Sequence, residues 1–253
     1  IDVEALLRAD YIIHLAGAGV VDKKWTAAYK KEILESRTLS SKLIIDTLSK
    51  HPHHVKALVS ASATGWYGAD KIKGHAFVET DPADKDFLGE TCRLWEASVE
   101  PAEQLDIAVC KLRTGIVLSK EGGALAEFKK PLNFGVAGIL GNGKQVISWI
   151  HIDDLCRMYI YAMENAAMRG SYNAVAPAPV TNKELTIKLA ETIRGKFYIP
   201  MHVPAFVLKI MMGSRSEEVL KSTTVSAEKI KQQGFTFLYP SIDAALSNLF
   251  KKD

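Results

Sequence analysis

Three short segments of small, polar or basic residues each follow an apolar, β-type stretch of the chain. The segments are Ala16-Gly17, Ser60-Ala-Ser62 and Arg113-Thr114, at the ends of stretches that cover residues 11–16, 55–60 and 107–112. In an open parallel sheet, ligands bind outside the carboxyl ends of the strands, and small residues there let a ligand approach the backbone. The three segments therefore predict one shared binding site. Arg113 could bind a cofactor or a substrate carboxylate there, or could equally pair with an acidic side chain of the protein.

Other residues with chemical potential occur in patterns that favour structural roles. His51, His53 and His54 follow a predicted helix without a nearby cluster of carboxylates, which favours a surface loop over a metal site. No G-x-S-x-G motif is present, so serine-hydrolase chemistry has little support. The three cysteines are far apart and form no C-x-x-C pair, at positions Cys92, Cys110 and Cys156. This spacing argues against structural zinc or a disulfide scaffold, and favours a reducing compartment.

The elements that must position the three segments alternate between strands and helices. Long helices are predicted over residues 25–49 and 87–104, between the three apolar stretches. The stretch over residues 11–16 lacks polar alternation, which is typical of a strand covered on both faces. This order of strands and helices predicts right-handed βαβ units and a parallel sheet.

After Gly122-Gly123 the chain becomes richer in glycine and loops. A short helix is predicted over residues 125–129, a strand over 146–152, and a helix capped by Asp153 or Asp154 that ends near residue 166. A further strand is predicted over residues 172–175, and Thr181 with Glu184 fits the capping box that begins a helix. We expect the apolar segment around Phe206 and Met211 to be ordinary buried helix core.

Length and composition exclude several classes of protein. The chain has 253 residues, of which 47% are hydrophobic and 24% charged, as in globular domains. Its net charge of +3 and scattered lysine pairs give no basic stripe, so no nucleic-acid partner is expected. No apolar run approaches the ~18 residues of a membrane helix. We therefore expect a cytoplasmic protein without a membrane or nucleic-acid partner, and leave the oligomeric state open, a homodimer included.

An ordered set of motifs resembles the extended short-chain dehydrogenase/reductase superfamily. More narrowly, the chain resembles its atypical branch of epimerase family proteins, labelled NAD-dependent epimerase/dehydratase or cell-division-inhibitor-like. The motifs run in the same order over nearly the whole chain: Leu15-Ala-Gly17, Ser60-Ala-Ser62-Ala-Thr-Gly-Trp-Tyr67-Gly68, Trp95-Glu96, Leu112-Arg-Thr-Gly115, Glu121-Gly-Gly-Ala124, Gly141-Asn-Gly-Lys-Gln145, Ser148-Trp-Ile-His-Ile-Asp-Asp154, Tyr172-Asn173, Ala176-Pro177 and Gly234-Phe235.

The resemblance implies an α/β fold with a Rossmann-like, doubly wound parallel sheet and a smaller α/β C-terminal substrate domain. The corresponding division is a Rossmann-type domain over residues 1–119, a substrate-domain insertion over 120–150, a return to the Rossmann domain over 151–178 and a small C-terminal domain over 179–253. The implied cofactor is NADP, with NAD as the alternative. The residues implied to bind it are Leu15, Ala16, Gly17, Ser60, Ala61, Ser62, Leu112, Arg113, Thr114 and Gly115. Gly17 or Gly115 alone would favour a plain turn, whereas the ordered set favours cofactor binding.

The resemblance also implies candidates for the chemistry. Ser62 matches the catalytic serine of the superfamily, which binds a carbonyl or hydroxyl oxygen of the substrate, and Thr64 is the alternative. The competing interpretation is a strand-end serine that satisfies a turn amide. Tyr67 matches the aromatic residue of the family's Tyr-Gly turn and is a third candidate. Trp149, His151 and Gln145 are candidates for substrate contact, although a structural His151 and a solvated Gln145 are the simpler interpretations. No metal is expected.

The sequence departs from the superfamily pattern in its phosphate-binding turn. A Gly-x-x-Gly-x-x-Gly turn at the start of a helix normally holds the cofactor pyrophosphate, and none occurs before Tyr11. We therefore expect that roughly three strands of the family's sheet, with this turn, precede residue 1. If the native protein began at residue 1, ordinary dinucleotide binding would fail.

Two further departures affect the chemistry. The Tyr-x-x-x-Lys pair that transfers the proton during hydride transfer is replaced by Leu88 and Cys92. A formal match from Tyr67 to Lys71 lies in a loop, where helical geometry is not expected. Ile147 occupies the position of an arginine that grips the phosphates of nucleotide-sugar substrates, so a UDP-sugar substrate is doubtful.

These features predict a protein that binds NAD(P)(H) and acts as an oxidoreductase or epimerase on a small carbonyl or alcohol. Water or an unidentified group would donate the proton, because the tyrosine is missing. The alternative is a non-catalytic NADP(H)-binding sensor or protein-interaction module. The sequence does not identify the substrate, because no motif is specific for one.

Overall fold

The computed structural model describes residues 1–251, and the chain divides into two compact units. The first unit consists of Ile1–Gly68, Glu79–Arg113 and Arg157–Asn173. The second consists of Ala69–Val78, Thr114–Cys156 and Ala174–Asp253, of which only the part up to residue 251 is described. Each unit is described by itself below.

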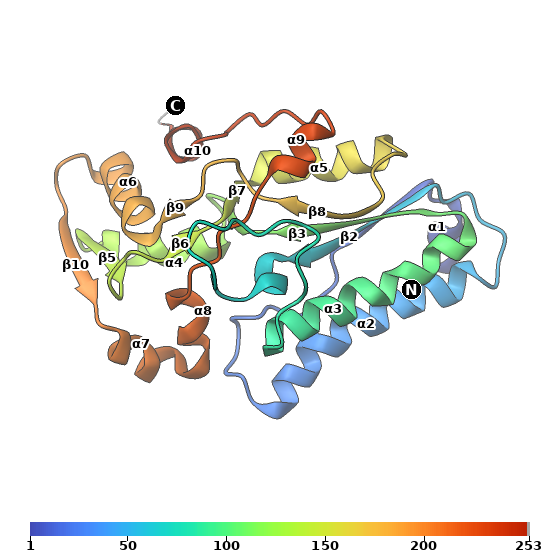
Figure 1. Ribbon diagram of the computed structural model, residues 1–253, viewed down its shortest axis with the longest axis horizontal. Helices are drawn as coiled ribbons and strands as arrows, with labels where there is room; N and C mark the ends of the chain where they lie inside the picture. The colour runs from blue at the N-terminus through green and yellow to red at the C-terminus, as the bar shows by residue number, and fades with distance from the viewer. Residues whose placement is uncertain (252–253) are drawn as a thin grey trace. The chain divides into compact units, whose positions relative to one another are not determined.

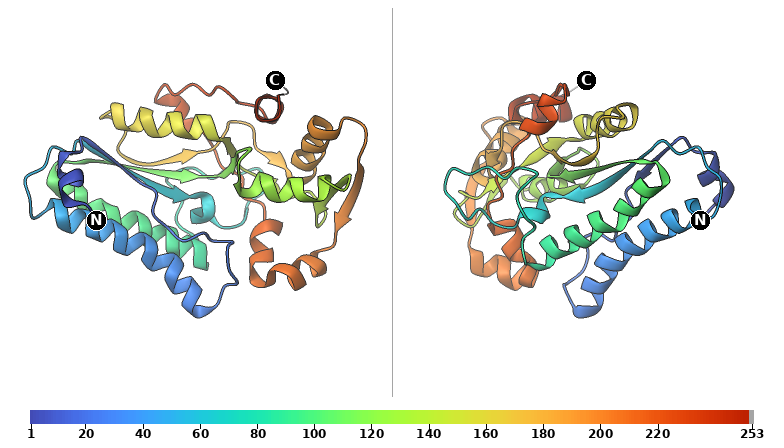
Figure 2. Two further views of the ribbon diagram at one scale, coloured as in Figure 1. Left: turned by 180° about the vertical axis from the view of Figure 1, so that it is seen from behind. Right: turned by 45° about the vertical axis from the view of Figure 1, so that its right-hand side comes forward.

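The first unit is built on a sheet with the strand order β1-β2-β3-β8. Its strands are β1 (Tyr11–His14), β2 (Ala57–Ala63), β3 (Ala108–Thr114) and β8 (Gly170–Ala174). Tyr11 pairs with Ala57 and His14 with Ser60 in a parallel register. Helices α2 (Ala27–Leu48) and α3 (Phe87–Val99) lie side by side on one face, and the part of α5 (Ile152–Glu164) in this unit lies on the other (Figures 1 and 2). The predicted Rossmann-like α/β fold is confirmed.

The sequence accounts for how these helices begin and which face they bury. Thr26 accepts a hydrogen bond from the Tyr29 amide, and Asp86 accepts one from the Gly89 amide, so each caps the first turn of its helix. The buried residues of α2 recur every three or four positions: Tyr29, Ile33, Arg37, Ser41, Ile45 and Leu48. This stripe packs toward α3 and the sheet, yet its centre is polar.

Shorter elements complete the first unit. They are α1 (Val3–Arg8) and the 3-10 helices η1 (Thr64–Tyr67) and η2 (Glu100–Leu105). One hydrophobic cluster gathers Ile12 from β1, Leu48 from α2, Leu58 from β2 and Ile107, with others from α3 and β3. The core therefore lies under the amino-terminal half of the strands, because the residues beyond it toward their carboxyl ends are small or polar.

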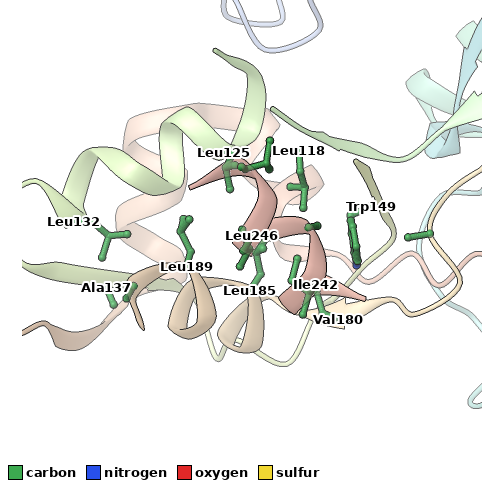
Figure 3. Packing of buried hydrophobic residues seen from close by; sticks show 14 residues of the cluster. Leu118, Leu125, Leu132, Ala137, Trp149, Val180, Leu185, Leu189, Ile242 and Leu246 are labelled. Carbon is green, nitrogen blue, oxygen red and sulfur yellow. The ribbon is translucent and has the colours of Figure 1, made fainter. Parts of the chain in front are cut away.

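The second unit contains short strands and helices around a separate core. Its elements are β4 (Ile116–Leu118), α4 (Gly123–Leu132), β5 (Val136–Leu140), β6 (Val146–Ile147), β7 (Trp149–His151), the start of α5, β9 (Val180–Thr181), α6 (Asn182–Arg194), β10 (Ile199–Val203), α7 (Ala205–Met212), η3 (Gly213–Arg215), α8 (Ser216–Leu220), α9 (Glu228–Gln232) and α10 (Ile242–Leu249). Three two-stranded pairs form, namely β4 with β7 and β10 with β5 in parallel, and β6 with β9 in antiparallel orientation. Leucines of α4, α6 and α10 form a hydrophobic cluster that includes Trp149 at its edge (Figure 3).

Three predictions for this unit were wrong and one was confirmed. The strand predicted over residues 146–152 is two short strands, because residues 146–147 pair with β9 and residues 149–151 pair with β4, and Ile152 already belongs to α5. Neither Asp153 nor Asp154 caps α5, because the helix begins at Ile152 and both lie in its first turn. The Asp154 carboxylate instead accepts from the backbone amides of residues 238 and 239. Thr181 caps α6 as predicted, by accepting from the Glu184 amide.

The third wrong prediction concerns α7, which was expected to be buried core. Only Leu208 of this helix is buried, whereas Phe206 is 67% and Ile210 is 79% exposed. An apolar sequence predicts burial by composition, but burial depends on which elements pack around the helix. Within residues 1–251, no helix has both the length and the hydropathy needed to span a membrane.

Candidate functional site

Ser62 lies near the carboxyl end of β2 and is almost fully buried. Its hydroxyl donates a hydrogen bond of 2.7 Å to the Glu96 carboxylate on α3. A hydroxyl has one proton, and here a carboxylate accepts it. Ser62 therefore retains only its oxygen lone pairs for a ligand, and can accept a hydrogen bond from a substrate hydroxyl more readily than donate one to a carbonyl.

Glu96 is also held by Arg113 from the end of β3. Arg113 Nε lies 2.8 Å from Oε1 and Nη2 lies 3.0 Å from Oε2, a two-point contact between side chains that are 3% and 4% exposed. The Ser171 hydroxyl donates the fourth hydrogen bond, at 2.8 Å. Burial lowers the pKa of Arg113, but hydrogen bonds to Glu96 and the charge of Glu96 outweigh it and raise the pKa overall. The sequence left open whether Arg113 binds a ligand or an acid, and in the structure it binds an acid.

Tyr67 belongs to the same buried network. Its phenol oxygen accepts from Arg113 Nη1 at 3.0 Å and donates to Asn173 Oδ1 at 2.6 Å. The Arg113 guanidinium also stacks over the Trp66 ring, with its carbon 3.6 Å from the ring centroid. Burial raises the pKa of Tyr67 to about 12, and the nearby Arg113 only partly offsets it. The phenol therefore stays protonated at neutral pH and is not positioned as a general base.

The helix positions that replace the usual tyrosine and lysine hold no proton-transfer group. Leu88 is half-buried and Cys92 is buried, and both pack against the turn at Gly65. Burial, and then the charge of Glu96, raises the pKa of the Cys92 thiol to about 12. The formal match from Tyr67 to Lys71 is not a helical pair, because η1 ends at Tyr67.

The end of β1 exposes its backbone and its side chains. Leu15 is 61% exposed, and Ala16 and Gly17 are exposed as well. A Cβ on Gly17 would lie 2.9 Å from the guanidinium carbon of Arg37. Glycine is therefore needed here for a buried side chain of α2, a reason that the sequence did not reveal.

The other residues predicted to bind the cofactor have different surroundings. Ser60 is buried and donates to the Ala61 carbonyl at 3.0 Å, and Leu112 is fully buried. Ala61 and Thr64 are half-buried at the end of β2. In the second unit, Thr114 is half-buried, and a Cβ on Gly115 would lie 2.5 Å from the Ser148 carbonyl oxygen. Gly115 therefore permits close backbone packing.

The three residues predicted to contact substrate are held within the second unit. Trp149 is fully buried in the hydrophobic cluster and its indole N–H donates to the Ala178 carbonyl (Figure 3). His151 is buried, its Nδ1 accepts from the Asp153 amide, and burial lowers its pKa. Gln145 Nε2 donates to the carbonyl groups of residues 140 and 219. Each side chain has a structural role in its own unit.

Sequence reasoning did not single out Glu96, Arg37 or Trp95 as individual residues. Glu96 entered only as part of a family motif, although its carboxylate connects Ser62 to Arg113. The sequence did contain a signal for Glu96. It is a charged residue on the buried face of α3, and a buried carboxylate requires a cation or hydrogen-bond donors as partners. Arg37 offered the same signal on α2, since it falls four residues after the buried Ile33.

Comparison with known proteins agrees with this fold and these motifs. The family model described as NAD dependent epimerase/dehydratase family matches residues 2–175, and a domain of unknown function matches residues 203–249. An epimerase family protein SDR39U1 homolog, chloroplastic, of Arabidopsis thaliana is 35% identical over 93% of this chain and 67% of its own length. An epimerase family protein of Staphylococcus aureus is 34% identical over 96% of this chain and 80% of its own length.

A solved structure extends the likeness to three dimensions. The crystal structure of human epimerase family protein SDR39U1 (isoform 2) with NADPH is 27% identical, and the match covers 99% of this chain and 86% of that one with a TM-score of 0.90. The family model covers more than half of the chain, and the bacterial relative is similar over most of its own length. These matches place the chain in the NAD dependent epimerase/dehydratase family.

Proposed function

We propose that this protein binds NADP(H), with NAD(H) as the alternative, at the carboxyl ends of β1 and β2. The observation that carries the proposal is the likeness to the human relative solved with NADPH. The exposed, small residues Ala16 and Gly17 fit a ligand that approaches the backbone, and Ala61, Ser62 and Thr64 end the adjacent strand. Leu112 and Ser60 are buried, so they would shape the site from beneath.

The reaction that this site supports best is oxidation or reduction of a small alcohol or carbonyl compound. Epimerisation of such a compound would use the same hydride transfer. When bound, the cofactor supplies hydride chemistry. Ser62 would accept a hydrogen bond from a substrate hydroxyl, because its own proton is donated to Glu96. A water molecule would carry the proton, since Leu88 and Cys92 replace the usual pair. Ile147 in place of arginine argues against a nucleotide-sugar substrate.

A second function, a cofactor-binding sensor without turnover, is favoured by the closed hydrogen-bond network. Tyr67 and Arg113 bind each other and other protein groups, and Tyr67 is held protonated. Such a protein would report the ratio of NADPH to NADP⁺ through its affinity for each form.

The test separates the two functions. Isothermal titration calorimetry of the protein with NADPH and with NADH measures cofactor choice, and a panel of small aldehydes, ketones and alcohols is then followed at the nicotinamide absorbance. Turnover that Ser62→Ala reduces and Ser98→Ala does not would support the enzyme, because Ser98 lies on α3 and donates only to the Trp95 carbonyl. Micromolar binding without turnover would support the sensor. Absence of binding at millimolar cofactor would contradict both.

We also propose the division of labour and the location. Residues 1–119 and 151–178 would form the cofactor-binding domain, whereas residues 120–150 and 179–253 would form the smaller substrate domain. The three cysteines are free thiols, which supports a cytoplasmic, reducing compartment.

A further inference from the structure

Arg37 is a buried cation whose contacts leave part of the guanidinium unused. The side chain is 9% exposed and lies at the centre of the buried stripe of α2. Its Nη1 donates to the Ala18 carbonyl at 3.0 Å and to the Ile33 carbonyl at 2.8 Å. The three N–H groups on Nε and Nη2 have no protein acceptor within residues 1–251. One complete edge of the fork, formed by Nε and Nη2, and one further N–H on Nη2 are therefore available to a ligand.

No carboxylate in the described part of the chain forms an ion pair with Arg37. The ionisable groups close enough to interact with it are Cys92, Tyr29 and His14, none of which is a carboxylate. Burial lowers the pKa of Arg37 because the charged form loses hydration. Buried arginines are normally paired with an anion. Moving an unpaired charge from water into a protein interior costs roughly several kcal/mol, even after the surrounding protein relaxes. Arg37 Nε and Nη2 are not among the fully buried atoms without a partner, so they reach solvent, and the described part of the chain supplies no anion to them.

Trp95 supplies a second unused donor at the same place. The Arg37 guanidinium stacks over the Trp95 ring at 4.8 Å from its centroid. Trp95 is 6% exposed, and its indole N–H is buried without a hydrogen-bond partner among residues 1–251. Buried polar groups almost always have partners, so an orphan donor beside an unpaired cation points to a missing acceptor.

Both donors lie at the carboxyl ends of the strands in the first unit. Arg37 contacts Gly17, which follows β1, and Cys92, one turn before Trp95 on α3, packs against Gly65 just after β2. Ser62 ends the same strand β2. The pyrophosphate of the cofactor would instead bind a glycine-rich turn, and no Gly-x-x-Gly-x-x-Gly pattern occurs in this part of the sheet.

We propose that Arg37 and Trp95 form a carboxylate-binding site that selects a small oxo acid or hydroxy acid as substrate. The planar guanidinium matches the two oxygens of a carboxylate, and the indole N–H adds a third donor. This inference rests on the proposed function, and it names the substrate class for that site. A phosphate of the cofactor is the competing source of the same oxyanion chemistry.

The experiment titrates oxalate, a redox-inert dicarboxylate, into the full chain saturated with NADP⁺, by calorimetry at constant ionic strength in potassium chloride. We expect saturable binding that Arg37→Met weakens by at least roughly tenfold, because a charge-assisted hydrogen bond is lost. Trp95→Phe keeps the ring and removes only the N–H, and should weaken binding by about threefold to tenfold. Arg93→Met, on the exposed face of α3 where Arg93 pairs with Glu90, should leave oxalate affinity unchanged.

Each outcome decides the proposal. Undetectable oxalate binding to the wild-type protein, or equal affinity of Arg37→Met and wild type, would overturn it. A loss of NADP⁺ affinity of tenfold or more in Arg37→Met would assign the site to a cofactor phosphate instead. If NADP⁺ does not bind at all, the oxalate titration without cofactor still tests the site, and only the proposed function fails. If Arg37→Met does not fold by circular dichroism, the comparison of Trp95→Phe with Arg93→Met decides.

Discussion

Two arginines are buried in the same unit of this protein, and they have opposite surroundings. Arg113 is 3% exposed and meets a carboxylate with two hydrogen bonds, a phenol with a third and a backbone carbonyl with a fourth. Arg37 is 9% exposed and meets only two carbonyls and an aromatic face. The first is complete within the protein and acts as part of its structure. Arg37 gains an anionic acceptor only when a ligand binds. Both side chains are buried, so burial alone does not distinguish a structural charge from a functional one.

The largest expected effect is the loss of stability on removing the complete arginine. Arg113→Met leaves Glu96 buried and without its cation, which should lower the free energy of unfolding by about 3–5 kcal/mol in urea denaturation. Arg93→Met removes an exposed pair and should change it by less than about 1 kcal/mol. The double variant Arg113→Met with Glu96→Leu should recover much of the loss. Equal stability of Arg113→Met and wild type would contradict the description of this pair as structural.

Tyr67→Phe tests the same network with a smaller change. At pH 7 the variant should lose about 1–2 kcal/mol of unfolding free energy, because Arg113 and Asn173 each lose a buried partner. The pKa of Tyr67 is about 12 in the folded protein, above its ordinary value near 10, so folding favours the protonated phenol. Above pH 10 the unfolded chain releases this proton first, and the stabilisation by the phenol is therefore lost as pH rises toward 12.

The measurement is the difference in unfolding free energy between wild type and Tyr67→Phe at several pH values. Below pH 9 the difference should be constant, and between pH 10 and 12 it should shrink by as much as roughly 2–3 kcal/mol. Other groups titrate in the same range, and the difference between the two proteins cancels their effect. A difference that is independent of pH up to 12 would show that the pKa of the phenol is not raised.

Apolar runs and capping residues predicted the helices and strands of this fold, because such patterns depend only on residues that are close in the sequence. The apolar runs ending near Ala16, Ser60 and Leu112 predicted three strands, and Thr181 predicted the start of a helix through its hydroxyl. The network could not be predicted in this way. Tyr67 and Asn173 are 106 residues apart, and no signal near either indicates that they meet. The sequence places Arg37 four residues after Ile33 on one helix face, but only the packing of α2 against α3 shows that its side chain is buried.

Gly17→Ala tests the role of Arg37 in a second way, because it should displace the Arg37 guanidinium and leave the charge in place. A Cβ at this position would lie 2.9 Å from the guanidinium carbon, closer than van der Waals contact allows, so the side chain has to shift. We expect a loss of about 1 kcal/mol in unfolding free energy and a severalfold loss in oxalate affinity, both measured as above. Gly138→Ala is the matched control, because an added Cβ there would meet its nearest atoms at 3.6 Å or more, which is ordinary van der Waals contact, and Gly138 does not have a positive φ. Equal effects of the two substitutions would mean that Gly17 does not position Arg37.

Arg37→Met should have the smallest effect on stability. This small effect is what distinguishes Arg37, as a ligand-binding residue, from the structural Arg113. Removing this cation breaks two hydrogen bonds to carbonyls, yet it also removes an unpaired charge from the interior and leaves a flexible apolar chain of similar length over the Trp95 ring. These contributions oppose each other, so the free energy of unfolding should change by less than about 1 kcal/mol, against about 3–5 kcal/mol for Arg113→Met. Urea denaturation without added anion measures both values under the same conditions. A loss as large as that of Arg113→Met would make Arg37 a structural residue as well, and the contrast between a charge satisfied by the fold and a charge left for a ligand would no longer hold.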